Sequence, residues 1–593
     1  MSWLFACGNL QQNRRMSAEV KHMKWWGWGE EGVSFDLSDR PGVWPYLAGQ
    51  LGITEPEMTP PVTFESIQLP AMKRHEPFLA DVRRALKPDQ FRDDKMERLV
   101  HSAGKSFRDL WRLRRGLVSH APDLVVYPES EADIVTLVTA AHVHEVVLIP
   151  FGGGSNIAGC LESKDVHGRM IVSLDMGRMN RVLEVDSQSL VARLQPGALG
   201  DDMEAQLQSH GVTLGHFPDS FLHSTLGGWI ATRSAGMQSD KYGKIEDMVL
   251  SLRMVTPQGT IVTRTVPKCA NGIDVRQLCV GSEGILGVIT EAVMQVHPQP
   301  AHKDYYGWLF PDFESGAASI HECMRRGCMP VITRLNDPQK TALSFAFKTS
   351  KPPLKEAVGK VVKWYLGKVR GIDFSKCCLM IVACEGDHAT FHRVRQESAN
   401  VFRKHGGVYL GVEPGRSFQR AKFDFPHLRD YVMDRNIMAD VSETATTWAN
   451  LLPSYYDTRR SIEQAICDTG SAPWVGCHIS HNYHSGASLY YTFGALQSKG
   501  RELAQYLYVK KAAEDAFMRN GGTLSHHHAV GSEHIPWVTD DISATGVAAV
   551  RALKHGLDPG GIMNPGKILP SENPLETWGL PESVARQFNN TGK

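Results

Sequence analysis

The spacing of apolar and polar positions changes along the chain and predicts four segments. Residues 1–119 carry helical periodicities, for example over 76–86 and 94–113, among many charged residues. Between residues 120 and 299 the apolar positions instead fall in short runs that are typical of strands and are separated by polar turns. We therefore predict a helical N-terminal segment over 1–119 and an α+β domain over 120–299.

The start of this domain predicts a strand, a helix and a second strand. A proline ends the strand at 124–127, and Ser130 with Asp133 forms a capping-box pattern that opens a helix through His142. The next strand, 146–149, leads directly into three glycines, which places them at the carboxyl end of a strand. This loop consists of Pro150, Phe151, Gly152, Gly153, Gly154, Ser155 and Asn156.

The rest of the chain predicts two further segments. Residues 300–505 mix strands, such as 379–384, with helices, and we predict that they form a second domain. Residues 506–593 are mainly helical in pattern, with a helix predicted over 543–557.

Composition and charge narrow the function classes. The 593 residues suffice for two or three domains, and 64 acidic and 64 basic side chains cancel. A balanced surface lacks the positive footprint of nucleic-acid-binding proteins, so we expect no nucleic-acid partner. No apolar run reaches the ~18 residues typical of a membrane-spanning helix. The eleven cysteines form no Cys-x-x-Cys pair, and we expect a soluble protein of a reducing compartment.

Neither end of the chain carries a clear targeting signal. Arg15-Met16 followed by His22-Met23 loosely echoes an amino-terminal peroxisomal signal, but its apolar positions are atypical. The last four residues, 590–593, are not the tripeptide that peroxisomal import receptors bind. We therefore predict a cytoplasmic location.

The glycine loop has the chemistry of an anion cradle. Because glycines lack a Cβ atom, their backbone N–H groups can converge on a diphosphate, and Ser155 and Asn156 add side-chain donors. The same residues also fit an ordinary turn. No Gly-Lys-Ser/Thr follows, which excludes a nucleoside-triphosphate loop, and Ile157 stands where a dinucleotide-binding loop needs its last glycine.

Two later segments are dense in small residues. Residues 218–236 contribute hydroxyls and glycines through which a backbone can approach a flat ring closely. In residues 281–290 glycines flank an apolar stretch that would equally suit a tight strand connection. The ligand-binding candidates in these two segments are Asp219, Ser220, Ser224, Thr225, Ala231, Thr232, Arg233, Ser234, Glu283, Gly284, Ile285, Leu286, Gly287, Val288 and Ile289.

In this order, the three motifs resemble the FAD domain of the vanillyl-alcohol-oxidase family. Within it the chain is similar to the alkylglycerone phosphate synthases, at 23–29 and 215–220 and again at 485–490 and 521–531. The resemblance implies an α+β fold with a two-part FAD-binding domain, an α+β substrate (cap) domain, and helical N- and C-terminal segments, the last completing the active site. FAD would be bound non-covalently, because Ser155 stands where some relatives in the wider fold carry a linking histidine.

The resemblance also implies a reaction. Alkylglycerone phosphate synthases replace the acyl group of an acyl dihydroxyacetone phosphate by a long-chain fatty alcohol, which forms the ether bond of ether lipids. In the family's mechanism a base takes a proton from substrate C1, oxidised flavin N5 takes up the carbon, the fatty acid leaves and the alcohol attacks. There is no net oxidation or reduction.

Residues of the second half match the family's catalytic groups. Tyr490 matches a catalytic tyrosine whose role as proton acceptor demands a phenol pKa depressed by neighbouring cations or histidines. A core aromatic is the alternative interpretation, and the adjacent Tyr491 is the natural control. His526, His527 and His528 match essential histidines; as an extended segment they would point 526 and 528 to one side and 527 to the other.

The three histidines also raise the question of a metal. Glu533 is the only carboxylate near them in sequence, and no histidine pair at helical spacing accompanies them. We therefore expect catalysis without a metal.

Two arginines complete the predicted site. Arg429 matches the family's substrate-binding arginine, and a guanidinium suits a phosphate monoester; a surface ion pair with Asp430 or Asp434 is the alternative. Arg334 matches an arginine that the family needs for activity, and its alternative is a structural ion pair with Asp337.

Other functions share part of this pattern. FAD-linked dehydrogenases or oxidases of 2-hydroxy acids, of the D-lactate or glycolate type, carry the same three FAD motifs but not the combination of Tyr490, Arg429 and the histidines. Ala529 and the ending at 564–567 depart from the animal synthases and leave this alternative open. A silent flavoprotein that binds lipid or a partner is disfavoured because Tyr490 is retained.

The resemblance implies partners as well. Acyl dihydroxyacetone phosphate and fatty alcohol are amphiphiles, so we expect peripheral contact with a membrane. Eukaryotic members are peroxisomal, but without a convincing import signal we predict a cytoplasmic protein peripheral to a membrane. A homodimer stays open.

Overall fold

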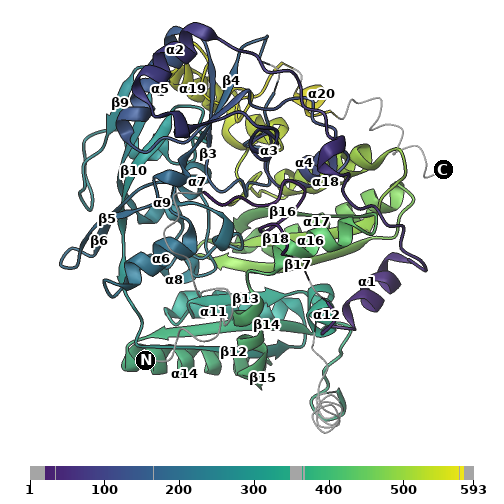
Figure 1. Ribbon diagram of the computed structural model, residues 1–593. Helices are drawn as coiled ribbons and strands as arrows, with labels where there is room; N and C mark the ends of the chain where they lie inside the picture. Colours follow the sequence, from purple (N-terminus) through teal and green to yellow (C-terminus); the bar gives the residue numbers. More distant parts are fainter. Residues whose placement is uncertain are drawn as a thin grey trace.

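Four β-sheets and the helices around them form the part of the chain that the computed structural model describes (Figure 1). It describes residues 20–347, 364, 367–572 and 574–579, except 34, 36 and 165, so the address-like residues 15–16 and 590–593 lie outside it. Within the described residues, no helix is long and apolar enough to cross a membrane.

The first sheet forms where the strand, helix, strand unit was predicted. Its order is β1-β2-β4-β3, and β2 and β3 both run parallel to β4. The Ser130 hydroxyl accepts a hydrogen bond from the N–H of Asp133, which confirms the predicted helix start. The elements are α2 (Glu76–Ala85), β1 (Phe91–Arg92), β2 (Leu124–Val126), α5 (Glu131–Val143), β3 (Val147–Phe151) and β4 (Ile171–Asp175).

The second sheet completes a two-part domain. It is antiparallel, with the order β5-β6-β10-β8-β9, and a two-stranded sheet of β7 and β11 lies beside it. The elements are β5 (Val182–Asp186), β6 (Val191–Leu194), α6 (Gly200–Gln208), β7 (Val212–Thr213), α7 (Leu226–Thr232), α8 (Ser239–Tyr242), α9 (Ile245–Met248), β8 (Val249–Thr256), β9 (Gly259–Val262), α10 (Val275–Cys279), β10 (Val288–Gln295) and β11 (His297–Pro298).

A seven-stranded antiparallel sheet dominates the segment after residue 300. Its order is β15-β12-β14-β13-β17-β18-β16. The elements are β12 (His302–Phe310), α11 (Phe313–Arg326), β13 (Ile332–Asn336), α12 (Pro338–Ala346), β14 (Cys378–Gly386), α14 (His388–Lys404), β15 (Val408–Gly411), α15 (Glu413–Ala421), α16 (Phe425–Met433), β16 (Ile437–Thr447), α17 (Trp448–Asp468), β17 (Trp474–Asn482) and β18 (Gly486–Leu496).

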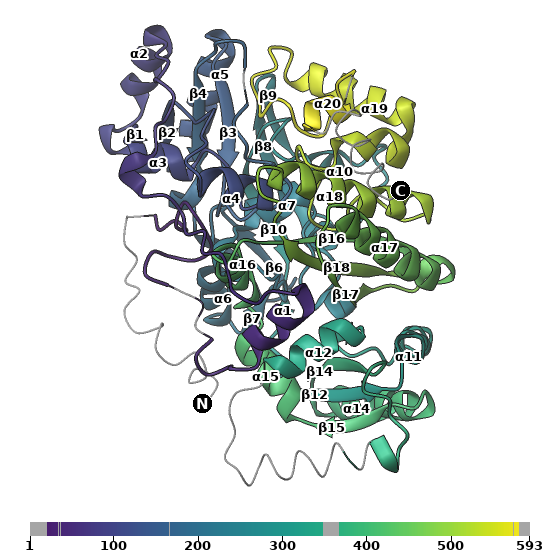
Figure 2. The same ribbon diagram turned by 90° about the vertical axis from the view of Figure 1, so that its right-hand side faces the viewer.

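The two faces of this large sheet have different surroundings. One face packs against α11, α14 and α17 (Figure 2). Leu489 and Tyr491 of β18 belong to the apolar core on this side. Because side chains alternate along a strand, Tyr490 and Thr492 point to the other face and line a cavity there. Helices α12, α15 and α16 lie beside that second face.

The N-terminal segment contains a strand as well as the predicted helices. Its strand β1 pairs with β2, and α1 (Val43–Leu51) packs against α12 of the cap domain. The single helix predicted over 94–113 is wrong: the chain forms α3 (Lys95–Val100) and α4 (Phe107–Leu113) with a break between them. At the break, Gly104 lies so close to the glycine loop that a Cβ would come 2.3 Å from the Asn156 carbonyl oxygen.

The C-terminal segment returns to the first domain. Its helices are α18 (Glu502–Arg519), α19 (Val538–Leu557) and α20 (Pro574–Trp578). The domain boundary predicted between residues 505 and 506 falls inside α18, and the other boundaries stay predictions. The helix predicted from 543 is the second half of α19, which bends at Ser543, where φ is 68°.

Candidate active site

One cavity of about 1850 Å³ lies between the two-part domain and the face of the seven-stranded sheet that carries Tyr490 and Thr492. Its wall includes residues of all three glycine motifs, of β13, β17 and β18, and of the loop with the consecutive histidines. Sites for single small ligands are typically about 300–1,000 Å³. The cavity therefore has room for a cofactor and a long substrate together.

The first two motifs pack directly against each other. A Cβ on Gly152 would lie 2.3 Å from the Thr225 hydroxyl oxygen, and one on Gly153 would lie 1.9 Å from the His223 carbonyl oxygen. Glycine is therefore required at both positions by contact with the second motif. Among the described residues, none accepts a hydrogen bond from the backbone N–H groups of Gly153, Gly154 or Ser155, so these donors remain available to an anion.

Most of the predicted cofactor-binding residues reach the cavity. Those in its wall are Pro150, Phe151, Gly152, Gly153, Gly154, Ser155, Asn156, Asp219, Ser220, Ser224, Thr225, Ala231, Thr232, Ser234, Glu283, Gly284, Gly287, Val288 and Ile289.

Three predicted residues lie outside the wall. Arg233 ends α7 in a left-handed conformation and donates hydrogen bonds to Gln277 instead. Ile285 and Leu286 belong to the apolar core of the second sheet. Sequence proximity to the motifs placed them in the site, but their side chains point away from the cavity.

Asn156 and Glu283 line the cavity yet bind protein groups. The Asn156 amide oxygen accepts hydrogen bonds from the N–H groups of Ala158 and Cys160, both at 2.9 Å. The Glu283 carboxylate accepts hydrogen bonds from Val530 N–H and Gly531 N–H, both at 2.7 Å. Glu283 thus ties the loop that follows the histidines to the third motif.

The register of the large sheet assembles a row of polar side chains. Asn336 of β13 pairs with His478 of β17, which pairs with Tyr490 of β18, which pairs with Glu443 of β16. Directly paired residues share one face of a sheet at about 5 Å spacing. Four residues that are far apart in sequence therefore form one line across the cavity face.

Aromatic rings surround Tyr490. The His478 ring stacks on it with centroids 4.7 Å apart, and His527 and His528 lie at 5.9 and 5.3 Å. The predicted tyrosine and two of the predicted histidines therefore meet. Tyr491 points into the apolar core, where its hydroxyl lies 3.2 Å from the Ser454 carbonyl oxygen.

The expectation of a depressed phenol pKa is wrong for this structure. Burial raises the pKa of Tyr490, and the Asp219 carboxylate raises it further, while Arg429 and Arg334 lower it too little to compensate. Tyr490 is therefore a neutral phenol at neutral pH. It can accept a substrate proton only if a neighbouring base takes its own proton in the same step.

The histidine run is curled, not extended as predicted. The backbone N–H groups of His526, His527 and His528 all donate to the Glu443 carboxylate, at 2.9, 3.0 and 3.1 Å. Successive N–H groups of an extended chain point to opposite sides and cannot share one acceptor. Ser525 donates its hydroxyl to the same carboxylate at 2.7 Å.

Glu443 is a site residue that the sequence did not reveal. Its side chain is buried, with 2% exposure. Burial would raise the pKa of Glu443, but His527 and His528 beside it hold the pKa well below its usual range. Glu533, the carboxylate singled out from sequence, instead faces Arg108 at 3.4 Å. Only the pairing register of β16 and β18 brings Glu443 under the histidines.

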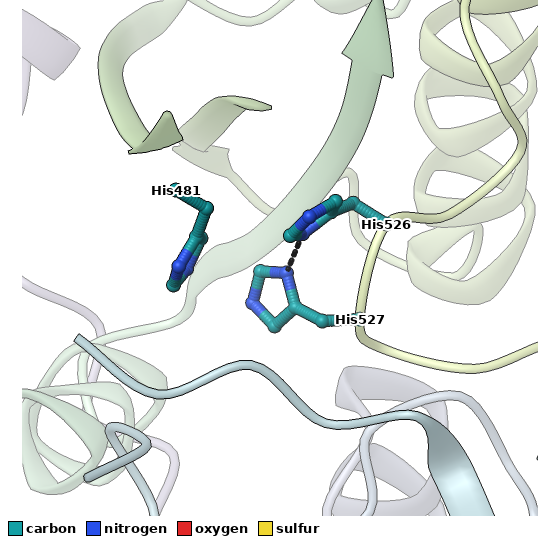
Figure 3. A group of neighbouring side chains, drawn as sticks. All are labelled: His481, His526 and His527. Atoms are coloured by element: carbon teal, nitrogen blue, oxygen red, sulfur yellow. Dashed lines mark hydrogen bonds between the residues drawn. The ribbon is translucent and has the colours of Figure 1, made fainter. Parts of the chain in front are cut away.

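A hydrogen-bonded chain links the histidines (Figure 3). The His526 Nδ1 lies 3.0 Å from the His527 Nδ1, and the His526 Nε2 lies 2.7 Å from the Tyr483 hydroxyl. Burial, together with Lys244, holds the pKa of His526 well below its usual range, so its ring is neutral at pH 7. A neutral imidazole carries one N–H donor and one acceptor, which allows a proton to pass between these groups.

A metal could also find ligands here. Nitrogens of His481, His526 and His527 all lie within 4.8 Å of one another. Each of these rings already uses a nitrogen in a hydrogen bond, His481 to the Ser239 hydroxyl at 2.7 Å. The absence of a metal stays a prediction.

Arg429 faces the cavity from α16. It donates to the Asp440 carboxylate at 2.7 Å and to the Lys105 carbonyl oxygen at 2.8 Å. The surface ion pair considered from sequence is wrong, because Asp430 pairs with Lys24 and Asp434 with another arginine.

Arg334 faces the cavity from β13. Its guanidinium lies over the rings of Phe418 and Phe425, at 5.7 and 6.0 Å from their centroids. Asp337 does not pair with it and instead caps α12 by accepting the Lys340 N–H at 2.8 Å. Among the described residues, Arg334 forms no ion pair.

Comparisons with known proteins agree with this arrangement. A family model for the FAD binding domain matches residues 122–265, and one for the C-terminal domain of FAD linked oxidases matches residues 299–568. An alkyldihydroxyacetonephosphate synthase of Dictyostelium discoideum is 42% identical over 513 residues, which cover 86% of this chain and 84% of the relative.

Two further likenesses extend over nearly the whole chain. An alkyldihydroxyacetonephosphate synthase of Trypanosoma brucei brucei is 38% identical over 577 residues and covers 94% of each chain. A solved structure of an alkyldihydroxyacetonephosphate synthase superposes with a TM-score of 0.80 at 38% identity, covering 92% of this chain and 98% of the other.

Proposed function

The chain belongs to the alkyldihydroxyacetonephosphate synthase family of FAD-dependent enzymes, and we propose that it replaces the acyl group of an acyl dihydroxyacetone phosphate by a long-chain fatty alcohol. The observation that carries this proposal is the meeting of Tyr490, His527 and His528 with Arg334 and Arg429 around one cavity. A 2-hydroxy-acid dehydrogenase would need the flavin site but not this combination.

The wall of the cavity fits FAD. Its glycine loop presents N–H donors that no described residue uses, and the second motif packs so tightly on this loop that side chains are excluded. Bound FAD supplies an electrophilic centre for the substrate carbon. Ser155 offers a hydroxyl where a covalent link would need an imidazole, so the cofactor is held non-covalently.

In this proposal Tyr490 accepts a proton and the histidines carry it away. The phenol stands between the stacked His478 ring and the His527 ring, so a proton that it accepts can leave toward the chain of His527, His526 and Tyr483. Glu443 fixes the backbone of that loop and keeps the histidine rings next to Tyr490.

The remaining wall suits an alkyl chain and a phosphate. Arg334 and Arg429 supply guanidinium groups for the phosphate monoester. Apolar side chains of the wall give a long chain a dry surface, and these include Leu47, Leu51, Leu343, Phe345, Phe347, Phe374 and Leu410. Because both substrates are amphiphiles, the proposal includes peripheral membrane contact of a cytoplasmic protein.

An exchange assay tests the proposal. The flavin-loaded enzyme is incubated with palmitoyl dihydroxyacetone phosphate and radiolabelled hexadecanol, and in parallel with D-lactate or glycolate. We expect label in a base-stable ether lipid and no loss of flavin absorbance with either hydroxy acid. Bleaching of the flavin by a hydroxy acid without label transfer would replace the proposal by a dehydrogenase.

A further inference from the structure

Lys340 is a buried lysine that faces the cavity without a carboxylate partner. It lies in the first turn of α12, its exposure is 8%, and it is part of the cavity wall. Within the described chain no carboxylate approaches its Nζ closely enough to form an ion pair. Buried lysines are normally paired, so a protonated Lys340 would lack a counter-charge here.

The surroundings of Lys340 aim it at the reacting end of the cavity. Its Nζ lies 2.7 Å from the His478 Nδ1, 3.4 Å from the Tyr490 carbonyl oxygen and 5.0 Å from the Tyr490 ring centroid. The stem lies flat on β17, because a Cβ on Gly476 would come 2.8 Å from the Lys340 Cγ. The position of the amine is therefore fixed by the sheet.

The charge balance distinguishes Lys340 and Arg334 from Arg429. The guanidinium of Arg429 is paired with Asp440 at 2.7 Å, a carboxylate that also lies 3.9 Å from Lys510, so part of its charge is balanced within the protein. Arg334 is a cation without an ion pair among the described residues. Together Arg334 and a protonated Lys340 carry two positive charges, which match the two negative charges of a phosphate monoester.

We propose that Lys340, held by His478, forms with Arg334 the subsite that binds the phosphate of the substrate, and that Lys340 takes up a proton when this dianion binds. The proposal rests on the proposed function and adds a residue that the family motifs did not indicate. When Lys340 is protonated its Nζ can only donate, so His478 then accepts through Nδ1 and carries its N–H at Nε2.

The other groups around Lys340 agree with this proton uptake. Burial lowers the pKa of Lys340 to about 7, and nearby Arg334 lowers it, while Cys477, Asp337 and Asp219 raise it. At pH 8 a lysine with this pKa is roughly one-tenth protonated. A bound dianion favours the charged form, so binding draws a proton from solution.

Proton uptake is measured on the flavin-loaded enzyme by calorimetric titration with glycerol 3-phosphate at pH 8, in two buffers of different ionisation enthalpy. We expect uptake of most of a proton per site, because burial lowers the pKa of Lys340 to about 7 in the free site and the bound dianion favours the charged form. Uptake near zero in the wild-type enzyme overturns the proposal, and this measurement needs no variant to fold.

Kinetics of variants provide the second test. Lys340→Met should raise KM for acyl dihydroxyacetone phosphate by at least tenfold and leave KM for the alcohol unchanged. In Lys340→Arg, KM for acyl dihydroxyacetone phosphate should lie close to the wild-type value. Lys303→Met is the matched control, because Lys303 has its own partner in Glu385 at 2.7 Å and lies outside the wall.

The outcomes separate the two proposals. Exchange activity with an unchanged KM for acyl dihydroxyacetone phosphate in Lys340→Met rejects the phosphate subsite but not the synthase. A wild-type enzyme without any exchange activity rejects the synthase itself.

Discussion

Tyr490 and Tyr491 are neighbours in sequence that face opposite sides of β18. Tyr490→Phe removes the hydroxyl of the ring that packs against His527 and His528, and we expect the exchange rate to fall by about 10²–10⁴-fold, as for loss of a general acid–base group. Tyr491→Phe removes a hydroxyl buried in the core, and we expect near-normal exchange with a loss of about 1 kcal/mol of unfolding free energy. Equal rates for the two variants would remove Tyr490 from the mechanism.

Glu443 makes a pH-dependent contribution to stability. Its folded pKa lies below its unfolded value of about 4.3, so the stabilisation is fully present above that value and is lost as the pH falls through the folded pKa. Glu443→Gln should therefore cost about 2–4 kcal/mol of unfolding free energy at pH 7, and the difference from wild type should shrink below pH 4.

Urea unfolding at pH 7 and at pH 3.5 measures this difference. The matched control is Glu397→Gln: among the residues that the structure describes, Glu397 forms a single ion pair, the exposed one with Arg393, and its loss should change stability by less than about 0.5 kcal/mol. A constant difference between wild type and Glu443→Gln over this pH range would show that Glu443 is not charged in the folded protein.

The loop after β3 requires glycine because another loop packs directly against it. Gly153→Ala places a Cβ 1.9 Å from the His223 carbonyl oxygen, so one of the two loops must move. We expect FAD content after purification to fall by at least tenfold, as measured by absorbance near 450 nm. Gly556→Ala in α19 is the control: its Cβ would meet no atom within 4 Å, and FAD content should not change.

Elements were easier to predict from sequence than the contacts between them. The strands and helix around the glycine loop follow from local periodicity and a capping box, and the structure has them within one or two residues. The break between α3 and α4 was missed although it leaves a local signal, because Ser106 caps α4 by accepting a hydrogen bond from the Asp109 N–H. Glu443 and Lys340 leave no such local signal: cross-strand pairing brings Glu443 to Tyr490, and helix α12 places Lys340 over His478.

The family resemblance predicted more of the site than the hydrophobic periodicity of the sequence did. It named Tyr490, Arg429, Arg334, His527 and His528, which all line one cavity, and His526, which lies outside the wall and is hydrogen-bonded to His527. It did not give their protonation states, because the raised pKa of Tyr490 depends on the depth of burial and on Asp219. The extended backbone assumed for the histidine run is wrong, because its three N–H groups converge on Glu443.

At the scale of the whole molecule, the cavity joins parts from every region of the chain. Its wall includes Leu47 of α1, the glycine loop, the large sheet and His528 of the C-terminal segment. FAD bound there should stabilise these parts together, by about 2.7 kcal/mol when free FAD is a hundred times its Kd. We expect removal of FAD to lower Tm of one common unfolding transition in calorimetry. An unchanged Tm would mean that the cofactor does not bind between these parts.

Counting both products of turnover tests the exchange reaction directly. Fatty acid release and ether formation are counted in the same reaction, with excess hexadecanol and with the flavin absorbance recorded before and after. We expect one fatty acid to be released for each ether bond formed, and an oxidised flavin at the end. Fatty acid release without ether formation, or a flavin left reduced after turnover, would contradict it.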